Sequence, residues 1–150
     1  MPDPVPALAH TPPVRLDVDA YERMIAHAYD GYPFEACGLL GGSLADATIV
    51  AFAPCRNVDE SARTYSIGPD GWRDAEDAYD ALGFHVVEVV HSHTHTDAYP
   101  SPTDIDKADN PLLEGWRYLI VSLRDTDPVL RCYLLDGRTV VEEVVELTGR

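Results

Sequence analysis

The sequence predicts a single α+β domain in which one β-sheet is flanked by helices. A chain of 150 residues, 45% of them hydrophobic, suits one domain with a real core. Strand-like runs outnumber the helical patterns, and the helices lie at separated places along the chain. The segments with the strand pattern are 36–41, 47–53, 63–67, 84–92, 117–123, 129–135 and 138–146.

Helical patterns occupy three places. The first helix is predicted over residues 18–30, where Asp19 and Glu22 form a capping-box pattern. Its apolar stripe consists of Tyr21, Met24, Ile25 and Ala28. A second helix is predicted over 70–82, with a solvated acidic face, and a short third helix over 102–109. The apolar stripe of the first helix indicates core packing rather than a cofactor site.

The ends of the chain have their own signals. Residues 1–13 are rich in proline and are predicted to form a flexible tail, so that the domain covers 14–150. Near the other end, Asp136-Gly137 separates two apolar segments and predicts a hairpin. There is no secretory signal pattern and no apolar run of membrane-spanning length.

Charge and cysteine content exclude some functions. A formal net charge of −15 argues against nucleic-acid binding, which requires clustered lysine and arginine. Cys37, Cys55 and Cys132 are odd in number and widely spaced, which favours buried thiols in a reducing cytoplasm over disulfides. Cys37 has the alternative interpretation of a reactive thiol.

The most informative segment is His91-Ser92-His93, followed after ten intervening residues by Asp104. Side chains alternate along a strand, so both imidazoles should project from one face. Ser101 and Pro102 predict a helix start, which places Asp104 in its first turn, close to the strand end. Two imidazoles and one carboxylate leave the fourth position of a tetrahedral zinc ion open, as in catalytic sites.

Each of these residues also has a structural interpretation. Histidines two positions apart occur by chance, and Asp104 could be a carboxylate that only favours the helix start. Ser101 could be a helix cap alone, although its hydroxyl is also placed to donate a hydrogen bond to a developing oxyanion. The combination of strand end, loop and helix start favours the metal site.

These motifs carry a resemblance to a known family. The run from His91 to Asp104, with Glu35-Ala36-Cys37-Gly38 upstream, resembles the JAMM (MPN+) metalloproteases, and most closely the bacterial CysO-cysteine peptidase branch. The similarity extends from about residue 14 to about residue 145, and it implies a mixed, curved sheet with a long helix on each side. Thr94 departs from the proline of most members, and His95 is an unusual extra imidazole.

The resemblance also implies roles. It nominates Glu35 as the group that takes a proton from water and delivers it to the leaving amine. From the sequence alone, Glu35 could equally be a solvated charge at a strand edge. His95 is expected outside the ligand set, with fourth-ligand binding as the alternative, because the following loop should turn the chain away after His93.

The implied activity is a zinc-dependent peptidase with one Zn²⁺ per chain. The branch implies removal of a C-terminal cysteine from a small ubiquitin-like sulfur-carrier protein with a Gly-Gly-Cys tail, which would lie along a strand edge. The alternatives are a peptidase that trims or deconjugates another ubiquitin-like protein, an enzyme acting on a small molecule, and a non-catalytic MPN-like scaffold. A homodimer is possible, and neither nucleic acid nor a membrane is expected as a partner.

Overall fold

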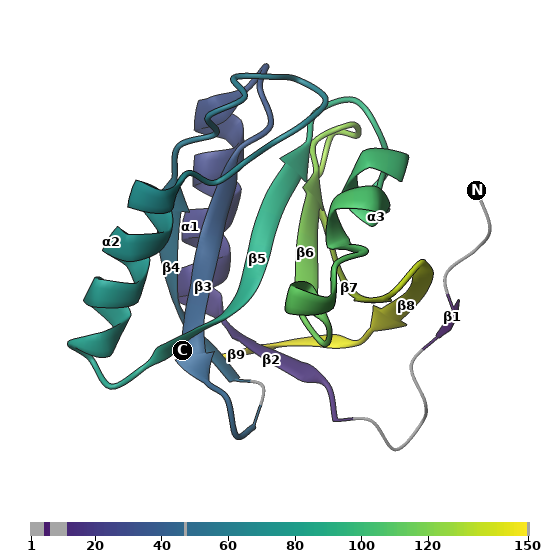
Figure 1. Ribbon diagram of the computed structural model, residues 1–150. Coiled ribbons are helices and arrows are strands. Elements are labelled where there is room, and N and C mark those ends of the chain that lie inside the picture. Colours follow the sequence, from purple (N-terminus) through teal and green to yellow (C-terminus); the bar gives the residue numbers. More distant parts are fainter. Residues whose placement is uncertain (1–4, 7–11, 47, 150) are drawn as a thin grey trace.

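The computed structural model describes residues 5–6, 12–46 and 48–149, and in these segments nine strands form one sheet (Figure 1). The strands are β1 (Val5–Pro6), β2 (Val14–Asp17), β3 (Cys37–Ser43), β4 (Thr48–Cys55), β5 (His85–His93), β6 (Arg117–Ser122), β7 (Val129–Asp136), β8 (Thr139–Glu143) and β9 (Val145–Thr148). The helices are α1 (Val18–Gly31), α2 (Pro69–Asp80), α3 (Pro102–Ala108) and the 3₁₀ helix η1 (Pro111–Leu113). No helix in these segments is long and apolar enough to cross a membrane.

The sheet is mixed and strongly curved. Its order is β1-β8-β7-β6-β5-β3-β4-β2-β9, with β5 parallel to β6, and β2 parallel to both β4 and β9. The consecutive strands β8 and β9 lie near opposite ends of this order, although only Val144 separates them in the chain. The sheet must therefore curl toward a barrel, which confirms the predicted α+β fold with a mixed, curved sheet.

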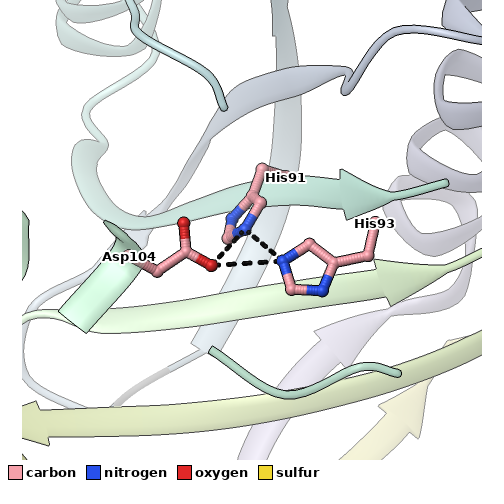
Figure 2. A group of neighbouring side chains, drawn as sticks. All are labelled: His91, His93 and Asp104. Atoms are coloured by element: carbon pink, nitrogen blue, oxygen red, sulfur yellow. Dashed lines mark hydrogen bonds and ion pairs between the residues drawn. The ribbon is translucent and has the colours of Figure 1, made fainter. Parts of the chain in front are cut away.

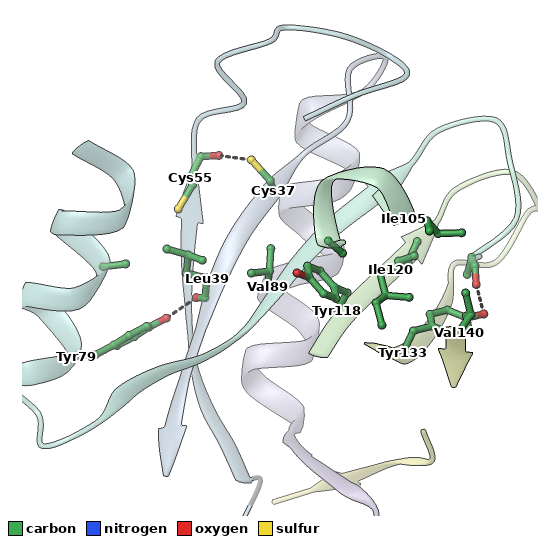
Figure 3. Close-up of a cluster of buried hydrophobic side chains, with 14 residues drawn as sticks. Cys37, Leu39, Cys55, Tyr79, Val89, Ile105, Tyr118, Ile120, Tyr133 and Val140 are labelled. Carbon is green, nitrogen blue, oxygen red and sulfur yellow. Dashed lines mark hydrogen bonds between the residues drawn. The ribbon is translucent and has the colours of Figure 1, made fainter. Parts of the chain in front are cut away.

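Helices cover both faces of the sheet (Figure 1). Helix α1 packs on one face, over a cluster that includes Leu40, Val90 and Leu119. The opposite face carries α2, α3 and a second cluster that includes Leu39, Val89 and Ile120 (Figure 3). Neighbouring residues on a strand enter different clusters because side chains alternate between the two faces.

Three parts of the chain differ from the sequence prediction. Residues 63–67 form a loop rather than a strand, with one isolated bridge from Ile67 to Asn57. The Asn57 side-chain amide donates hydrogen bonds to Glu35 O and Thr64 O, and its oxygen accepts one from Ser66 N. These side-chain hydrogen bonds replace the expected ladder of backbone hydrogen bonds. The strand predicted over 138–146 is broken at Val144, and the four-residue β2 was not expected.

The ends of elements otherwise follow local signals. Asp17 caps α1 by accepting hydrogen bonds from Asp19 N and Ala20 N, so the predicted capping box at Asp19 and Glu22 is wrong. Gly137 has a φ of 59°, which suits the predicted hairpin turn. Within the proline-rich N-terminal segment, Val5–Pro6 pairs with β8, whereas 1–4 and 7–11 lie outside the described residues. The flexible tail stays a prediction.

A buried charged cluster draws its residues from β5, β6 and β8, and β7 lies between the last two of these strands. Glu88 and Glu143 are 2% and 5% exposed, and Arg117 Nε donates to Glu143 Oε1 at 2.9 Å. Burial raises the pKa of Glu88 to about 8, with Arg117 lowering and Glu143 raising it further. The folded protein therefore binds this proton more tightly than the unfolded chain does.

Protein stability should consequently depend on pH through Glu88. Its pKa lies higher in the folded state than its ordinary value of 4.5, so its favourable contribution is complete below pH 4.5 and is lost as the pH rises through 8. We expect Glu88→Gln to gain stability relative to the unmodified protein between about pH 5 and pH 9, by a few kcal/mol at most. Urea unfolding across this range measures it, and parallel curves for the two proteins would contradict it.

Candidate metal centre

Three side chains converge where β5 ends and α3 begins (Figure 2). The Nε2 atoms of His91 and His93 lie 3.1 Å apart, and each lies 3.1 Å from Asp104 Oδ2. Both histidines are buried, with exposures of 1% and 2%. The structure thus brings together the three ligands expected from sequence, in a group compact enough to hold a metal ion.

The start of α3 fixes the carboxylate. Ser101 is the N-cap, as expected, and its Oγ accepts a hydrogen bond from Asp104 N at 3.0 Å. In return, Ser101 N donates to Asp104 Oδ2 at 2.9 Å, which completes a capping box. Pro102 in the first turn suits this start. The same short motif that begins the helix therefore points Asp104 at the histidines.

The protonation pattern suits a cation. His93 Nδ1 lies 2.7 Å from Asp97 O, and a carbonyl can only accept, so this nitrogen carries the proton. A neutral His93 then presents a bare Nε2 to the carboxylate of Asp104. Burial raises the pKa of Asp104, but the electrostatic interaction with His91 and the hydrogen bonds to both histidines outweigh burial and hold this pKa well below its usual range. The lone pairs of the two Nε2 atoms and of Asp104 Oδ2 lie so close together that a cation or a shared proton must lie between them. The three side chains therefore fit a metal ion.

His91 is held differently from His93. Its ring stacks on Tyr65, with centroids 4.2 Å apart and an interplanar angle of 19°. Burial lowers the pKa of His91, which favours the neutral form that ligates metals. The sequence did not indicate this role of Tyr65, because the residue falls in the strand predicted over 63–67, which does not form.

Glu35 lies just before β3 and is 5% exposed. Its backbone is fixed by Ser61 O and the Asn57 amide, while its Oε1 is buried without a hydrogen-bond partner among the described residues. Burial raises its pKa to about 8; His93 lowers this value and Asp104 raises it, so the carboxyl group is electrostatically coupled to the centre. The alternative of a solvated charge is wrong.

Cys37 and His95 lie near these groups without joining the ligand set. Burial raises the pKa of the Cys37 thiol to about 12, which argues against a reactive thiolate. Strand β5 ends at His93, so His95 falls in the exposed loop. There its ring and the Tyr32 ring pack edge to face, with their centroids 5.7 Å apart. His95 is absent from the one group of potential ligands found among the described residues.

His95 should therefore act on substrate rather than on metal. We expect His95→Ala to keep its metal content and to raise KM about tenfold if the imidazole donates one hydrogen bond to substrate. Metal analysis and steady-state kinetics measure both effects, and His95→Asn, which retains a donor, should recover part of the loss. Loss of metal from His95→Ala would instead identify a fourth ligand.

An apolar pocket of about 220 Å³ adjoins the centre. His91 and Asp104 form part of its lining, together with aliphatic floor residues from the sheet such as Val89 and Ile120. Its aromatic walls are Tyr65, Trp72, Trp116 and Tyr118. The two tryptophans meet edge to face at 5.8 Å although they are far apart in sequence, and the sequence carried no signal of this pocket.

Comparisons with known proteins show which family the chain belongs to. Residues 17–135 match the family model described as prokaryotic homologs of the JAB domain. The chain is 35% identical over 134 residues to a protein of Mycobacterium tuberculosis named CysO-cysteine peptidase, covering 86% of this chain and 87% of that one. It is 34% identical over 112 residues to a Haloferax volcanii protein named desampylase, covering 71% and 78%.

A solved structure shares the fold of this chain. The solution structure of a Desulfitobacterium hafniense protein matches with a TM-score of 0.82 and 32% identity, over 91% of this chain and 93% of that one. The match to the family model covers well over half of the chain. The chain belongs to the prokaryotic JAB-domain family, which confirms the family resemblance of its motifs.

Proposed function

We propose that this protein is a zinc-dependent peptidase with one Zn²⁺ per chain. The observation that carries the proposal is the convergence of His91, His93 and Asp104 beside the buried carboxyl group of Glu35. This donor set suits zinc and leaves a coordination position open. A bound zinc ion would lower the pKa of water and polarise the scissile carbonyl.

The protein groups around the metal would divide the remaining work. Glu35, whose buried Oε1 has no hydrogen-bond partner in the described part of the chain, would accept a proton from water and pass it to the leaving amine. Its pKa of about 8 lets the carboxyl group both gain and lose a proton near neutral pH. Ser101 Oγ accepts the Asp104 N–H through a lone pair, so its own O–H can still donate to the oxyanion.

The proposed reaction is hydrolysis of the Gly-Cys bond at the C-terminus of a ubiquitin-like sulfur-carrier protein, which releases cysteine in the cytoplasm. This proposal is supported by the 35% sequence identity to the mycobacterial protein named CysO-cysteine peptidase and by the motif around Glu35. The apolar pocket is larger than a cysteine side chain needs, so we assign it to an apolar side chain upstream of the two glycines. The three cysteines of the chain are free and buried, as expected in a reducing compartment.

The relative named desampylase favours a second candidate, a peptidase that deconjugates or trims another ubiquitin-like protein. Both candidates use the same residues and differ only in the group that leaves. A non-catalytic scaffold is disfavoured, because it has no use for a buried, coupled glutamate beside a set of metal ligands.

Mass spectrometry of candidate substrates distinguishes these functions. The zinc-loaded protein would be incubated with a carrier ending in Gly-Gly-Cys, and with a ubiquitin-like protein joined to a lysine through its terminal glycine. Loss of one cysteine from the carrier supports the first candidate. Cleavage of the isopeptide alone supports the second, and no turnover of either would favour the scaffold.

Ser101 offers a separate test of the site. We expect Ser101→Ala to retain zinc and to lose about two decades in kcat, because an oxyanion donor is worth roughly this much. The variant also loses a helix cap, so Asn110→Ala, which removes the cap of η1, serves as the matched control. Equal rates for Ser101→Ala and the unmodified protein would reduce Ser101 to a structural cap.

A further inference from the structure

The two histidines of the centre depend on different supports. The His91 ring stacks on Tyr65, and its Nδ1 is buried without a hydrogen-bond partner among the described residues. His93 instead donates from Nδ1 to the Asp97 carbonyl. The position of this carbonyl therefore fixes the tautomer and the ring orientation of His93, and so directs its Nε2 toward Asp104.

The loop that carries Asp97 is held by two hydroxyl groups of the neighbouring strands. Ser122, the last residue of β6, donates to Thr96 O at 2.5 Å. Tyr133, in β7, donates to Ala98 O at 2.5 Å. The carbonyl groups immediately before and after that of Asp97 are thus both hydrogen-bonded to the sheet. Asp97 O itself accepts the hydrogen bond from His93 Nδ1.

We propose that Tyr133 is a positioning residue for the metal centre, and that its hydroxyl holds the loop so that Asp97 O orients His93. The inference rests on the proposed metal-dependent function. Tyr133 is 1% exposed, and its ring packs against Tyr99 with centroids 5.7 Å apart. A phenylalanine would keep this packing and remove only the bond to Ala98 O.

The consequence follows from burial. Ala98 is 5% exposed, so its carbonyl without the Tyr133 hydroxyl would be a buried acceptor with no donor from the sheet. The loop would shift until this carbonyl meets water, and the adjacent Asp97 carbonyl would move with it. Residues that orient a metal-binding histidine in this way typically change metal affinity by about 10–100-fold when they are replaced.

The chain offers a closely matched control. Tyr79 lies in the same apolar cluster, is 4% exposed, and donates its hydroxyl to Leu39 O at 2.6 Å (Figure 3). Tyr79→Phe therefore removes the same kind of buried hydrogen bond as Tyr133→Phe, but from β3 rather than from the loop. A general loss of stability should affect both variants, whereas a loss of His93 orientation should affect only one.

The experiment measures Co²⁺ binding to the full chain by chelator competition, together with the visible absorption spectrum of bound Co²⁺. We expect Tyr133→Phe to weaken Co²⁺ binding by about 10–100-fold and to alter the spectrum, with Tyr79→Phe unchanged in both. Ser122→Ala, which removes the other anchor, should shift affinity in the same direction and serves as the test if Tyr133→Phe does not fold.

Each outcome has a distinct meaning. Affinity of Tyr133→Phe within twofold of the unmodified protein, with an unchanged spectrum, would overturn the positioning role while leaving the proposed function intact. An equal loss in Tyr79→Phe would overturn it as well, because the effect would then be one of general stability. Failure of the unmodified protein to bind Co²⁺ or Zn²⁺ would instead overturn the metal centre and the proposed function with it.

Discussion

Replacing His91 with alanine is expected to remove nearly all zinc from the protein, and peptidase activity with it. Only three protein ligands converge in the described part of the chain, and two ligands cannot hold the ion against competition from solvent. Asp104 would also lose the partner that contributes most to its lowered pKa, and it would remain as a partly buried carboxylate. Metal analysis of the purified variant measures the effect directly, and His93→Ala should behave in the same way.

His85→Ala is the control for this experiment. His85 begins the same strand, and its side chain is exposed and far from the ligand group. This variant should keep stoichiometric zinc and full activity. Circular dichroism should accompany both measurements, because His91→Ala also leaves space beside Tyr65. Stoichiometric zinc in both His91→Ala and His93→Ala would refute the assignment of the ligands.

The convergence of His91, His93 and Asp104 was predictable because its signals are local. The two-residue period of a strand places His91 and His93 on one face, and a serine-proline helix start places Asp104 in the first turn. Each inference uses only a few consecutive residues. The boundaries of β3, β5, β6 and β7 follow similarly from short apolar runs.

The parts that escaped prediction depend on contacts distant in sequence. The strand expected over 63–67 fails because the side chain of Asn57 takes the hydrogen bonds that a strand partner would have offered. The stacking of Tyr65 on His91 and the edge contact of Trp72 with Trp116 exist only once the sheet has curled and its helices have packed. No periodicity within one segment encodes them.

Glu35 falls between these two cases. Its role was nominated by the family resemblance. Its burial raises its pKa, and its backbone is held by hydrogen bonds to Asn57 and Ser61, which are distant in sequence. We expect Glu35→Gln to retain zinc and fold but to lose about two to four decades in kcat, since general acid–base catalysis contributes this much. An amide of nearly the same shape fills the site but cannot accept the proton of water.

Glu88→Gln provides a stringent control for this variant. Glu88 is another buried glutamate whose pKa burial raises to about 8, but it lies beside Arg117 and Glu143 rather than beside the ligands. Both substitutions remove a buried carboxyl group, so any general effect on folding should be shared by the two variants. Single-turnover kinetics of the zinc-loaded proteins should show the loss only in Glu35→Gln, with KM little changed, because the carboxyl group acts as the bond breaks rather than in binding. Near-normal turnover in Glu35→Gln would mean that the proton of water leaves by another route, and that the buried carboxyl group beside His93 is structural.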